Sequence, residues 1–316
     1  GMPAPAFNLH ISASGHGAMT GRMLEALEKL YIDEKPDVVV VYGDTNSTLA
    51  GALAAAKIHL PLAHVEAGLR SGDRGMPEEI NRLATDAITD LFFVTEPSGH
   101  EALLREGHPA DRIHFVGNVM IDNLFHQIQR LEANPASGGR GAALRAELGS
   151  TPYGVVTLHR PSNVDHPEKL AGMVGVLRTL AKDLPLVFPV HPRTRASLER
   201  HRIELGPNIR TTPPLSYMEF LSLWKDAQII LTDSGGLQEE SSAVGVRCVT
   251  LRDSTERPVT ITDGTNVLAG TNPAHILEVA RAALSQPASG KRPLLWDGRA
   301  AERILDVIVD SPLFAR

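Results

Sequence analysis

Short apolar runs alternate with amphipathic segments along almost the whole chain. The runs are rich in Val, Ile and Leu, which is typical of parallel strands buried on both faces, and the segments between them place apolar residues at helical spacing. The expected strands cover residues 37–44, 60–67, 91–96, 113–118, 153–160, 186–192, 228–236 and 247–253. The clearest helices cover residues 48–58, 78–88, 168–183, 216–226 and 273–286.

This alternation of strands and helices predicts an α/β fold with parallel sheets covered on both faces. The chain has 316 residues, enough for two domains. A Pro/Gly/Ser-rich stretch at 133–144 breaks the pattern and reads as a linker. We therefore predict two Rossmann-like domains, 1–138 and 139–297. A helix in 298–316 could pack on either domain and is assigned to the first.

Polar residues follow the expected strands, where ligands bind in open parallel sheets. Carboxylates come after the strands of the first half, and histidines, arginines and a glycine pair come after those of the second half. We expect one interdomain cleft to collect them. The residues are Asp44, Glu66, His159, Arg160, His191, Arg193, Ser234, Gly235 and Gly236.

Composition narrows the possible partners. The formal net charge of −6 offers no basic field for nucleic acid or an anionic membrane, so any phosphate must be bound by local positive groups. Cys248 is the only cysteine, which excludes an internal disulfide and favours a reducing, cytoplasmic location. Its apolar neighbours predict a core position. No apolar run approaches the roughly 18 residues that span a membrane.

The segment "DSGGLQEE", residues 233–240, lies between an expected strand and a helix. Gly235 and Gly236 would let backbone N–H groups approach a phosphate at the positive end of that helix, and Ser234 adds a hydroxyl. An ordinary helix cap explains the same pattern. Glu239 and Glu240 suit either the helix dipole or hydrogen bonds from ribose hydroxyls.

Two further groups have both functional and ordinary interpretations. Arg252 and Arg257, in "RDSTERP", could clamp a diphosphate or lie solvated on the surface. Phe220 could stack on a base or fill the core.

The stretch "HVEAGLRSGDRGMPEEINR", residues 64–82, carries many charges of both signs on a glycine-rich backbone. With Asp44, its carboxylates Glu66 and Glu78 are candidates for proton transfer. Helix caps or ion pairs are the alternatives, and for Glu79 an ion pair with Arg82, three residues on, is favoured.

The sequence lacks the motifs of several other functions. The 13 histidines show no zinc-ligand spacing such as H-E-x-x-H, so we predict no metal site. The third glycine of "GHGAMTG", residues 15–21, comes one place too late for a dinucleotide loop. No P-loop or G-x-S-x-G is present.

Seven ordered blocks, "GDTNSTLAGALAA", "HVEAGLRS", "MPEEINR", "LHRPSN", "PVHPRT", "LTDSGGLQEE" and "RDSTERP", resemble the non-hydrolysing UDP-N-acetylglucosamine 2-epimerases. The resemblance implies a glycosyltransferase-B type fold, with UDP held mainly by the second domain. It implies reversible interconversion of UDP-N-acetylglucosamine and UDP-N-acetylmannosamine without metal or nicotinamide. It also suggests a homodimer and a role in surface polysaccharide precursor synthesis.

The resemblance assigns roles to single residues. It implies that residues 64–82 form a mobile loop in which Arg70, Asp73 and Arg82 make supporting ion pairs. Which carboxylate removes the proton stays open. The implied catalytic residues are Asp44, Glu66, Glu78 and His159. The implied UDP-binding residues are Phe220, Ser234, Gly235, Gly236, Glu240 and Arg257, and we predict that Arg160, His191 and Arg193 join them.

The expected reaction is elimination of UDP through a 2-acetamidoglucal, followed by return of the proton to the opposite face. The family begins with a strand and a "GTRPE"-like loop that this sequence lacks, so we expect an incomplete first domain. Alternatives are a 2-epimerase of a related sugar such as UDP-2,3-diacetamido-glucuronate, a hydrolysing epimerase, or a non-catalytic UDP-sugar-binding fragment.

Overall fold

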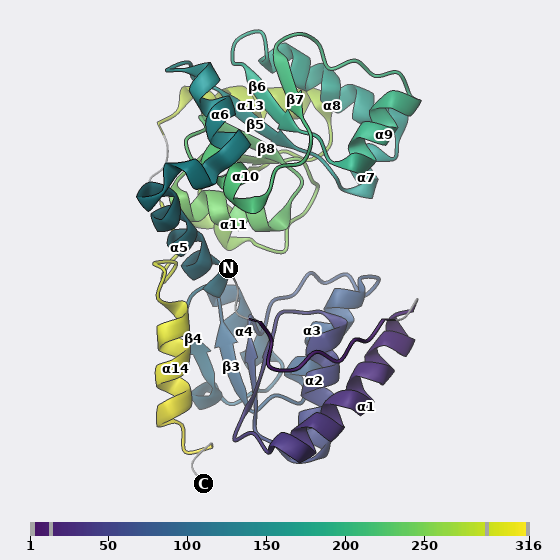
Figure 1. The fold of residues 1–316 in the computed structure, drawn as a ribbon, viewed down its shortest axis with the longest axis vertical. Coiled ribbons are helices and arrows are strands. Elements are labelled where there is room, and N and C mark those ends of the chain that lie inside the picture. Colours follow the sequence, from purple (N-terminus) through teal and green to yellow (C-terminus); the bar gives the residue numbers. More distant parts are fainter. Residues whose placement is uncertain (1–3, 13–14, 288–290, 314–316) are drawn as a thin grey trace. The chain divides into compact units, whose positions relative to one another are not determined.

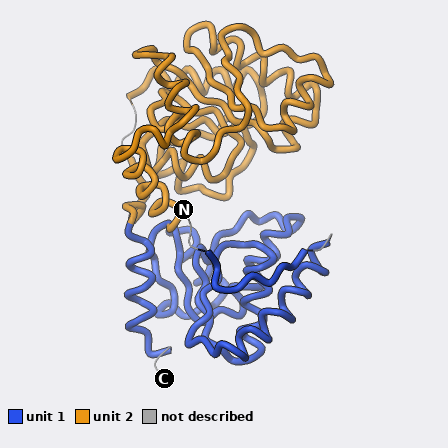
Figure 2. Tube along the Cα trace, in the orientation of Figure 1, with its two compact units in different colours: residues 1–118, 299–316 blue, residues 119–298 orange. Residues whose placement is uncertain are grey.

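The computed structural model describes residues 4–12, 15–287 and 291–313. The chain divides into two compact units (Figures 1 and 2). Unit 1 comprises Gly1–Asn118 and Arg299–Arg316, and unit 2 comprises Val119–Gly298. Each unit is built on one wholly parallel sheet with helices packed against it, which confirms the predicted fold class.

Unit 1 has a four-stranded parallel sheet in the order β1-β2-β3-β4. The inner strands β2 and β3 are buried at every position, whereas β1, at one edge, alternates buried and exposed residues. The strands are β1 (Val39–Tyr42), β2 (Leu62–Val65), β3 (Leu91–Val94) and β4 (Ile113–Phe115). The helices are α1 (His16–Glu34), α2 (Asn46–Lys57), α3 (Pro77–Asp86), α4 (Pro97–Arg105), η1 (Ala110–Arg112) and α14 (Ala300–Asp310).

Unit 2 has a six-stranded parallel sheet in the order β10-β9-β8-β5-β6-β7. The chain builds outward from β5 in one direction and from β8 in the other, so the strand order reverses between these two paired strands. Such a switch point is where doubly wound sheets bind ligands. The strands are β5 (Gly154–Thr157), β6 (Leu186–Pro189), β7 (Ile209–Thr212), β8 (Ile229–Thr232), β9 (Cys248–Thr250) and β10 (Asn266–Leu268).

The helices of unit 2 cover both faces of its sheet. Two apolar cores result, and Cys248, fully buried on β9, lies in the sheet between them. The helices are α5 (Val119–Ala133), η2 (Pro135–Gly138), α6 (Gly139–Leu148), α7 (Pro161–Val164), α8 (Pro167–Leu180), α9 (Pro192–Arg200), α10 (Tyr217–Trp224), α11 (Gly235–Val244), α12 (Val259–Thr262) and α13 (Pro273–Ser285). Among the described helices of the chain, none is long and apolar enough to cross a membrane.

The Pro/Gly/Ser-rich stretch at 133–144 is not the linker that its composition predicts. It forms η2 and α6, which pack on α10. A Cβ on Gly141 would lie 1.7 Å from the Glu219 carbonyl oxygen, so the glycines here serve close helix packing. The boundary between the units lies instead at Asn118 and Val119, because α5 packs on α11 of unit 2.

The C-terminal helix α14 belongs to unit 1. The Arg303 Nη1 donates a hydrogen bond to the Val116 carbonyl at the end of β4, at 3.0 Å. The chain therefore enters unit 2 after β4 and returns to unit 1 at its end.

Candidate active site

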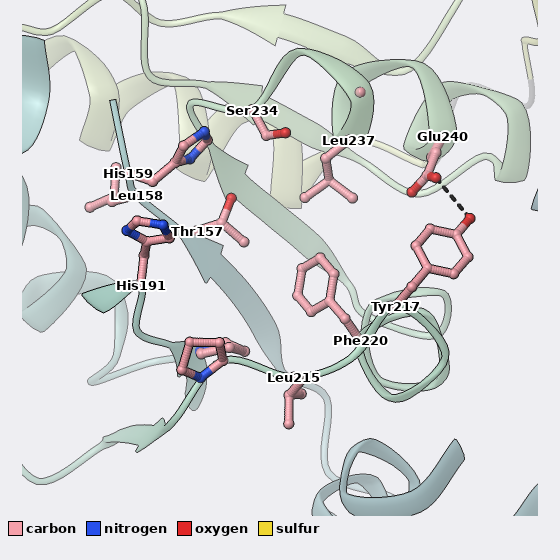
Figure 3. A pocket seen from close by; sticks show the side chains of 13 residues that line it. Thr157, Leu158, His159, His191, Leu215, Tyr217, Phe220, Ser234, Leu237 and Glu240 are labelled. Carbon is pink, nitrogen blue, oxygen red and sulfur yellow. Dashed lines mark hydrogen bonds between the residues drawn. The ribbon is translucent and has the colours of Figure 1, made fainter. Parts of the chain in front are cut away.

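A pocket of about 390 Å³ opens in unit 2 at the carboxyl ends of β5 and β8 (Figure 3). Its volume falls within the range of about 300–1,000 Å³ that small-molecule sites occupy. Most of its wall is apolar, and a few polar side chains point into it. The lining residues are Thr157, Leu158, His159, Pro189, His191, Pro214, Leu215, Tyr217, Phe220, Ser234, Gly236, Leu237 and Glu240.

His159 and Asp233 form a pair at the switch point. The His159 Nδ1 lies 2.8 Å from the Asp233 Oδ1, and the backbone N–H groups of His159 and Arg160 also donate to this carboxylate. The amide of Asn163 adds a further donor at 3.2 Å. Asp233 is fully buried, whereas the His159 side chain is 39% exposed, so the far edge of the ring faces the pocket.

The electrostatics of this pair favour a charged aspartate. Burial by itself would raise the pKa of Asp233. The hydrogen bond from the His159 ring and those from the backbone of Arg160 and His159 outweigh burial, so the pKa lies below its usual value. A carboxylate on Nδ1 fixes the ring orientation and stabilises an imidazolium, as in general acid–base sites.

The N-terminus of α11 borders the same pocket. Ser234 and Gly236 line it, and a Cβ placed on Gly235 would meet no protein atom within 4 Å. The space in front of this helix end is therefore open to a ligand. Backbone N–H groups of an α-helix end attract a phosphate there.

The opposite wall of the pocket carries a buried acid. The Tyr217 hydroxyl donates to Glu240 Oε1 at 2.8 Å, and the Phe220 ring lies beside them (Figure 3). Burial raises the pKa of Glu240 to about 7, because this carboxylate has a phenol rather than a cation as its partner.

Arg257 is held against α11. Its Nε donates to Glu239 Oε1 at 2.9 Å, and the preceding Thr255 hydroxyl donates to Gln238 Oε1. The other arginine of this loop, Arg252, is paired with Glu256 at 2.7 Å. Glu239 thus binds Arg257 of this loop. This ion pair is a third role for Glu239, beside the interaction with the helix dipole and the hydrogen bonds to ribose that the sequence suggests.

The remaining basic candidates of unit 2 differ in placement. His191 lines the pocket, with its ring centroid 5.9 Å from that of His159. Arg193 instead makes two hydrogen bonds of 2.9 Å to Asp165, outside the pocket lining. Arg160 contributes its backbone N–H to Asp233.

In unit 1, Asp44 follows β1 and is held by α3. Arg82 donates to its Oδ2 from Nε at 3.0 Å and from Nη2 at 2.6 Å. Asn81 donates to the Asp44 carbonyl at 2.9 Å. The third guanidinium nitrogen, Nη1, reaches Glu79 Oε2 at 2.9 Å, so the favoured Arg82–Glu79 ion pair is confirmed.

Glu79 also closes the loop that precedes α3. Its carboxylate accepts hydrogen bonds from the backbone N–H groups of Ser71 and Gly72 and from the Ser71 hydroxyl. Burial alone would raise the pKa of Glu79, but these donors together with Arg82 lower it. Residues 64–82 are therefore a hydrogen-bonded connection in which Glu79 is a structural anchor.

Two of the three predicted ion-pair residues in this segment have charged partners. Arg82 pairs with Asp44 and Glu79, and Arg70 pairs with Asp86. Asp73 accepts a hydrogen bond from the Gly75 backbone, and among the described residues it makes no ion pair, so that expectation is wrong. Its short side chain closes the turn next to it.

The other two catalytic candidates of unit 1 flank this network. Glu66 follows β2 with a φ of 74°, and its Oε2 lies 3.4 Å from where a Cβ on Gly43 would stand. Its carboxylate therefore rests against the loop that carries Asp44. Glu78 lies exposed in the first turn of α3.

Sequence reasoning passed over Asp233 and Tyr217 as site residues, and it did not single out Asp86, which pairs with Arg70. Asp233 stood in the quoted "TDSGG" motif, and its position at a strand end was the available signal. Nothing in the local pattern distinguishes Tyr217 or Asp86 from ordinary helix residues. The described part of the chain contains no cluster of three His, Cys, Asp or Glu side chains able to hold a metal ion.

A doubly wound domain with a polar-edged pocket at its switch point, joined in one chain to a second parallel-sheet domain, defines a two-domain α/β enzyme of the glycosyltransferase-B type. The chain belongs to the UDP-N-acetylglucosamine 2-epimerase family, whose family model matches residues 1–309. It is thus an epimerase.

Relatives support the same assignment. The chain is 41% identical to the UDP-N-acetylglucosamine 2-epimerase of Methanocaldococcus jannaschii over 313 residues, which is 97% of this chain and 84% of that protein. It is also 41% identical to the UDP-2,3-diacetamido-2,3-dideoxy-D-glucuronate 2-epimerase of Pseudomonas aeruginosa over 311 residues, 98% of this chain and 84% of that one.

A solved structure extends the likeness to the fold. The crystal structure of the Methanocaldococcus jannaschii enzyme in complex with UDP-GlcNAc and UDP superposes with a TM-score of 0.83 at 40% identity. The match covers 98% of this chain and 86% of that chain.

Proposed function

We propose that the chain interconverts UDP-N-acetylglucosamine and UDP-N-acetylmannosamine by reversible elimination of UDP through a 2-acetamidoglucal. The observation that carries this proposal is the His159–Asp233 pair beside the α11 N-terminus in the switch-point pocket. A histidine donor and a helix N-terminus together suit a diphosphate that gains negative charge as it leaves C1.

In this proposal UDP occupies the unit 2 pocket. The uracil would contact Phe220 and the ribose hydroxyls would bind Glu240. The phosphates would lie at the α11 N-terminus, with His159 as the donor to the leaving diphosphate. Arg257, fixed by Glu239, would add charge at the phosphates. The remaining assigned residues are Arg160, His191, Arg193, Ser234, Gly235 and Gly236.

The proton chemistry falls to the carboxylates of unit 1. A C2 proton of an intact sugar is not acidic, but loss of UDP gives C1 oxocarbenium character and makes the neighbouring proton labile. One carboxylate must then take the C2 proton, which gives the 2-acetamidoglucal. Another group must deliver a proton to the opposite face of C2 as UDP adds back to C1. Asp44, Glu66 and Glu78 are the candidates.

The decisive experiment is proton NMR of UDP-N-acetylglucosamine incubated with the chain in deuterated water. Loss of the C2 proton signal together with formation of UDP-N-acetylmannosamine is the expected result. No exchange, with UDP still raising the melting temperature, would favour a nucleotide-binding protein without catalysis. Free UDP and free sugar accumulating together would favour a hydrolysing epimerase.

A second substrate is a candidate because the Pseudomonas aeruginosa relative, which acts on a diacetamido-glucuronate, is equally similar in sequence. We expect kcat/KM to be higher for UDP-N-acetylglucosamine than for UDP-2,3-diacetamido-2,3-dideoxy-D-glucuronate. The reverse order would reassign the sugar while retaining the 2-epimerase chemistry.

The assembly is a homodimer in the same proposal. Light scattering of the purified chain should give twice the monomer mass of 34.0 kDa. A mass that stays at the monomer value across the working concentrations would contradict it.

A further inference from the structure

His64 lies at the centre of the unit 1 sheet and is completely buried. It stands on β2, with Val41 of β1 and Phe92 of β3 as its neighbours in register. A polar ring with no exposure needs partners for both nitrogens, because an unpaired buried donor or acceptor is destabilising. The structure provides both partners.

One nitrogen faces a carbonyl and the other a carboxylate. The Nε2 lies 2.8 Å from the Gly43 carbonyl oxygen, and the Nδ1 lies 2.6 Å from Asp86 Oδ1. A carbonyl oxygen only accepts, so Nε2 carries a proton. If Asp86 is ionised, it also only accepts, and Nδ1 carries a second proton.

Asp86 is surrounded by groups that favour its ionised form. Its other oxygen accepts a hydrogen bond from the Gly68 backbone at 3.1 Å and lies 2.7 Å from Arg70 Nη2. Burial alone would raise the pKa of Asp86, but the contacts with His64 and Arg70 lower it. Arg70 is balanced in turn by Glu106 at 2.6 Å. With Asp86 ionised, both ring nitrogens of His64 donate, in a chain of contacts that runs from the Gly43 carbonyl through Asp86 and Arg70 to Glu106.

The Gly43 carbonyl links this chain of contacts to the candidate acid–base groups. Gly43 directly precedes Asp44 and has a φ of 68°. The Glu66 carboxylate packs on the Cα side of Gly43, and α3 holds Asp44 through Arg82. With its carbonyl bound by His64, Gly43 cannot rotate without breaking a charge-assisted hydrogen bond.

We propose that His64 is a positioning residue of the epimerase, whose Nε2–H fixes the Gly43 carbonyl and through it the placement of Asp44 and Glu66. It touches no reacting atom. Because it would act through the carboxylates of the 2-epimerase reaction, this inference rests on the proposed function. Displacement of a catalytic group by about 1 Å can lower a rate about 10²-fold.

Two isosteric variants separate positioning from bulk stability. The side-chain amide nitrogen of Gln overlays His Nε2, and that of Asn overlays His Nδ1. His64→Gln therefore retains a donor to Gly43, whereas His64→Asn retains only the donor to Asp86. Both remove the positive charge, so they are matched in that respect.

We expect His64→Asn to lower kcat for C2 exchange about 10–100-fold with KM changed less than about twofold, and His64→Gln to lower kcat less than about fivefold. UDP affinity should stay at the wild-type value in both. His108→Gln, whose ring packs on Phe92, is the matched control in unit 1 and should leave kcat unchanged. Equal kcat losses in the two His64 variants, or the larger loss in His64→Gln, would overturn the proposal.

A second measurement does not depend on activity. In protein labelled with ¹⁵N-histidine, His64 should give two slowly exchanging ring N–H protons, both absent from His64→Gln. Absence of the Nε2 proton would contradict the contact with the Gly43 carbonyl even if the enzyme is active. If the wild type shows no C2 exchange but the two ring protons are present, the proposed function fails while the His64 bridge stands.

Discussion

Each of the two units contains a buried aspartate paired with a histidine, and the two histidines differ in exposure. In unit 1, Asp86 binds His64 at 2.6 Å; in unit 2, Asp233 binds His159 at 2.8 Å. Both aspartates are fully buried and both have lowered pKa values, because hydrogen bonds from the partner histidine and from other donors outweigh burial.

The difference lies in the second ring nitrogen. His64 is fully buried and uses Nε2 to hold the Gly43 carbonyl, whereas His159 is 39% exposed at a pocket. In our proposals the same kind of pair holds the backbone inside unit 1 and presents a donor to a ligand in unit 2. Access to the second nitrogen, rather than the charge of the pair, decides the role.

The largest effect is expected from breaking the His64–Asp86 pair. Asp86→Asn leaves His64 and Arg70 without their shared counter-charge, and breaking a buried charge pair from one side costs about 3–5 kcal/mol. Chemical denaturation followed by circular dichroism should show this loss of stability. Asp111→Asn, an exposed aspartate of the same unit, is the control. A loss equal to that of the control would mean that the pair contributes no stability.

The corresponding change in unit 2 should act on chemistry. Asp233→Asn removes the carboxylate that accepts from the His159 ring and fixes its orientation, and we expect kcat for C2 exchange to fall about 10²–10³-fold. UDP affinity should fall less than about tenfold, since the pocket walls remain. Stopped-flow or NMR rates with isothermal titration would measure both. An unchanged kcat would show that His159 takes no part in the reaction.

Glu240 extends the comparison, because this buried acid has the Tyr217 hydroxyl as its partner in place of a cation. The pKa of Glu240 is raised from 4.5 to about 7, so between these pH values the folded chain holds a proton that the unfolded chain releases. Its contribution to stability is complete below pH 4.5 and is lost as pH rises through 7, by about 3 kcal/mol.

Glu240→Gln should remove this pH dependence of the free energy of unfolding, measured by urea denaturation at pH 4.5, 6 and 7.5. The exposed Glu168→Gln is the control and should retain it. A wild-type stability that rises with pH across the window would contradict the raised pKa.

The smallest effect is expected from an exposed pair. Arg193 makes two hydrogen bonds to Asp165, but both side chains lie in solvent and outside the pocket lining. Exposed ion pairs contribute little, so Arg193→Ala should change UDP affinity less than about twofold in isothermal titration. A tenfold loss of UDP affinity would support Arg193 as one of the UDP-binding residues that the sequence predicts. Arg257→Ala is the comparison variant.

The strand pattern was the most reliable part of the sequence. All eight expected strands form, and most of them are buried runs rich in β-branched, aliphatic or aromatic residues. The two unpredicted strands are an edge strand with two exposed residues, Ile209–Thr212, and a three-residue strand, Asn266–Leu268. Helix α1 was also missed, since none of its residues is buried and its apolar face is weakly defined.

At the site, some residues could be identified from the sequence and others could not. Strand-end positions identified His159, His191 and Ser234, which line the unit 2 pocket, because parallel strands bring their carboxyl ends to one edge of a sheet. The linker at 133–144 was misjudged because glycine is equally suited to a flexible chain and to a close helix contact, and only the packing of α6 on α10 distinguishes them.

By itself, the sequence determined the fold class and eight of the ten described strands, because these depend on local apolar periodicity. The tertiary structure decided which partner each charge has: Arg82 with Asp44, Arg70 with Asp86, and Glu240 with a tyrosine. Such pairings join residues far apart in the chain. Ionisation and access to a ligand depend on these partners and on burial. Local sequence determines neither the partners nor the burial.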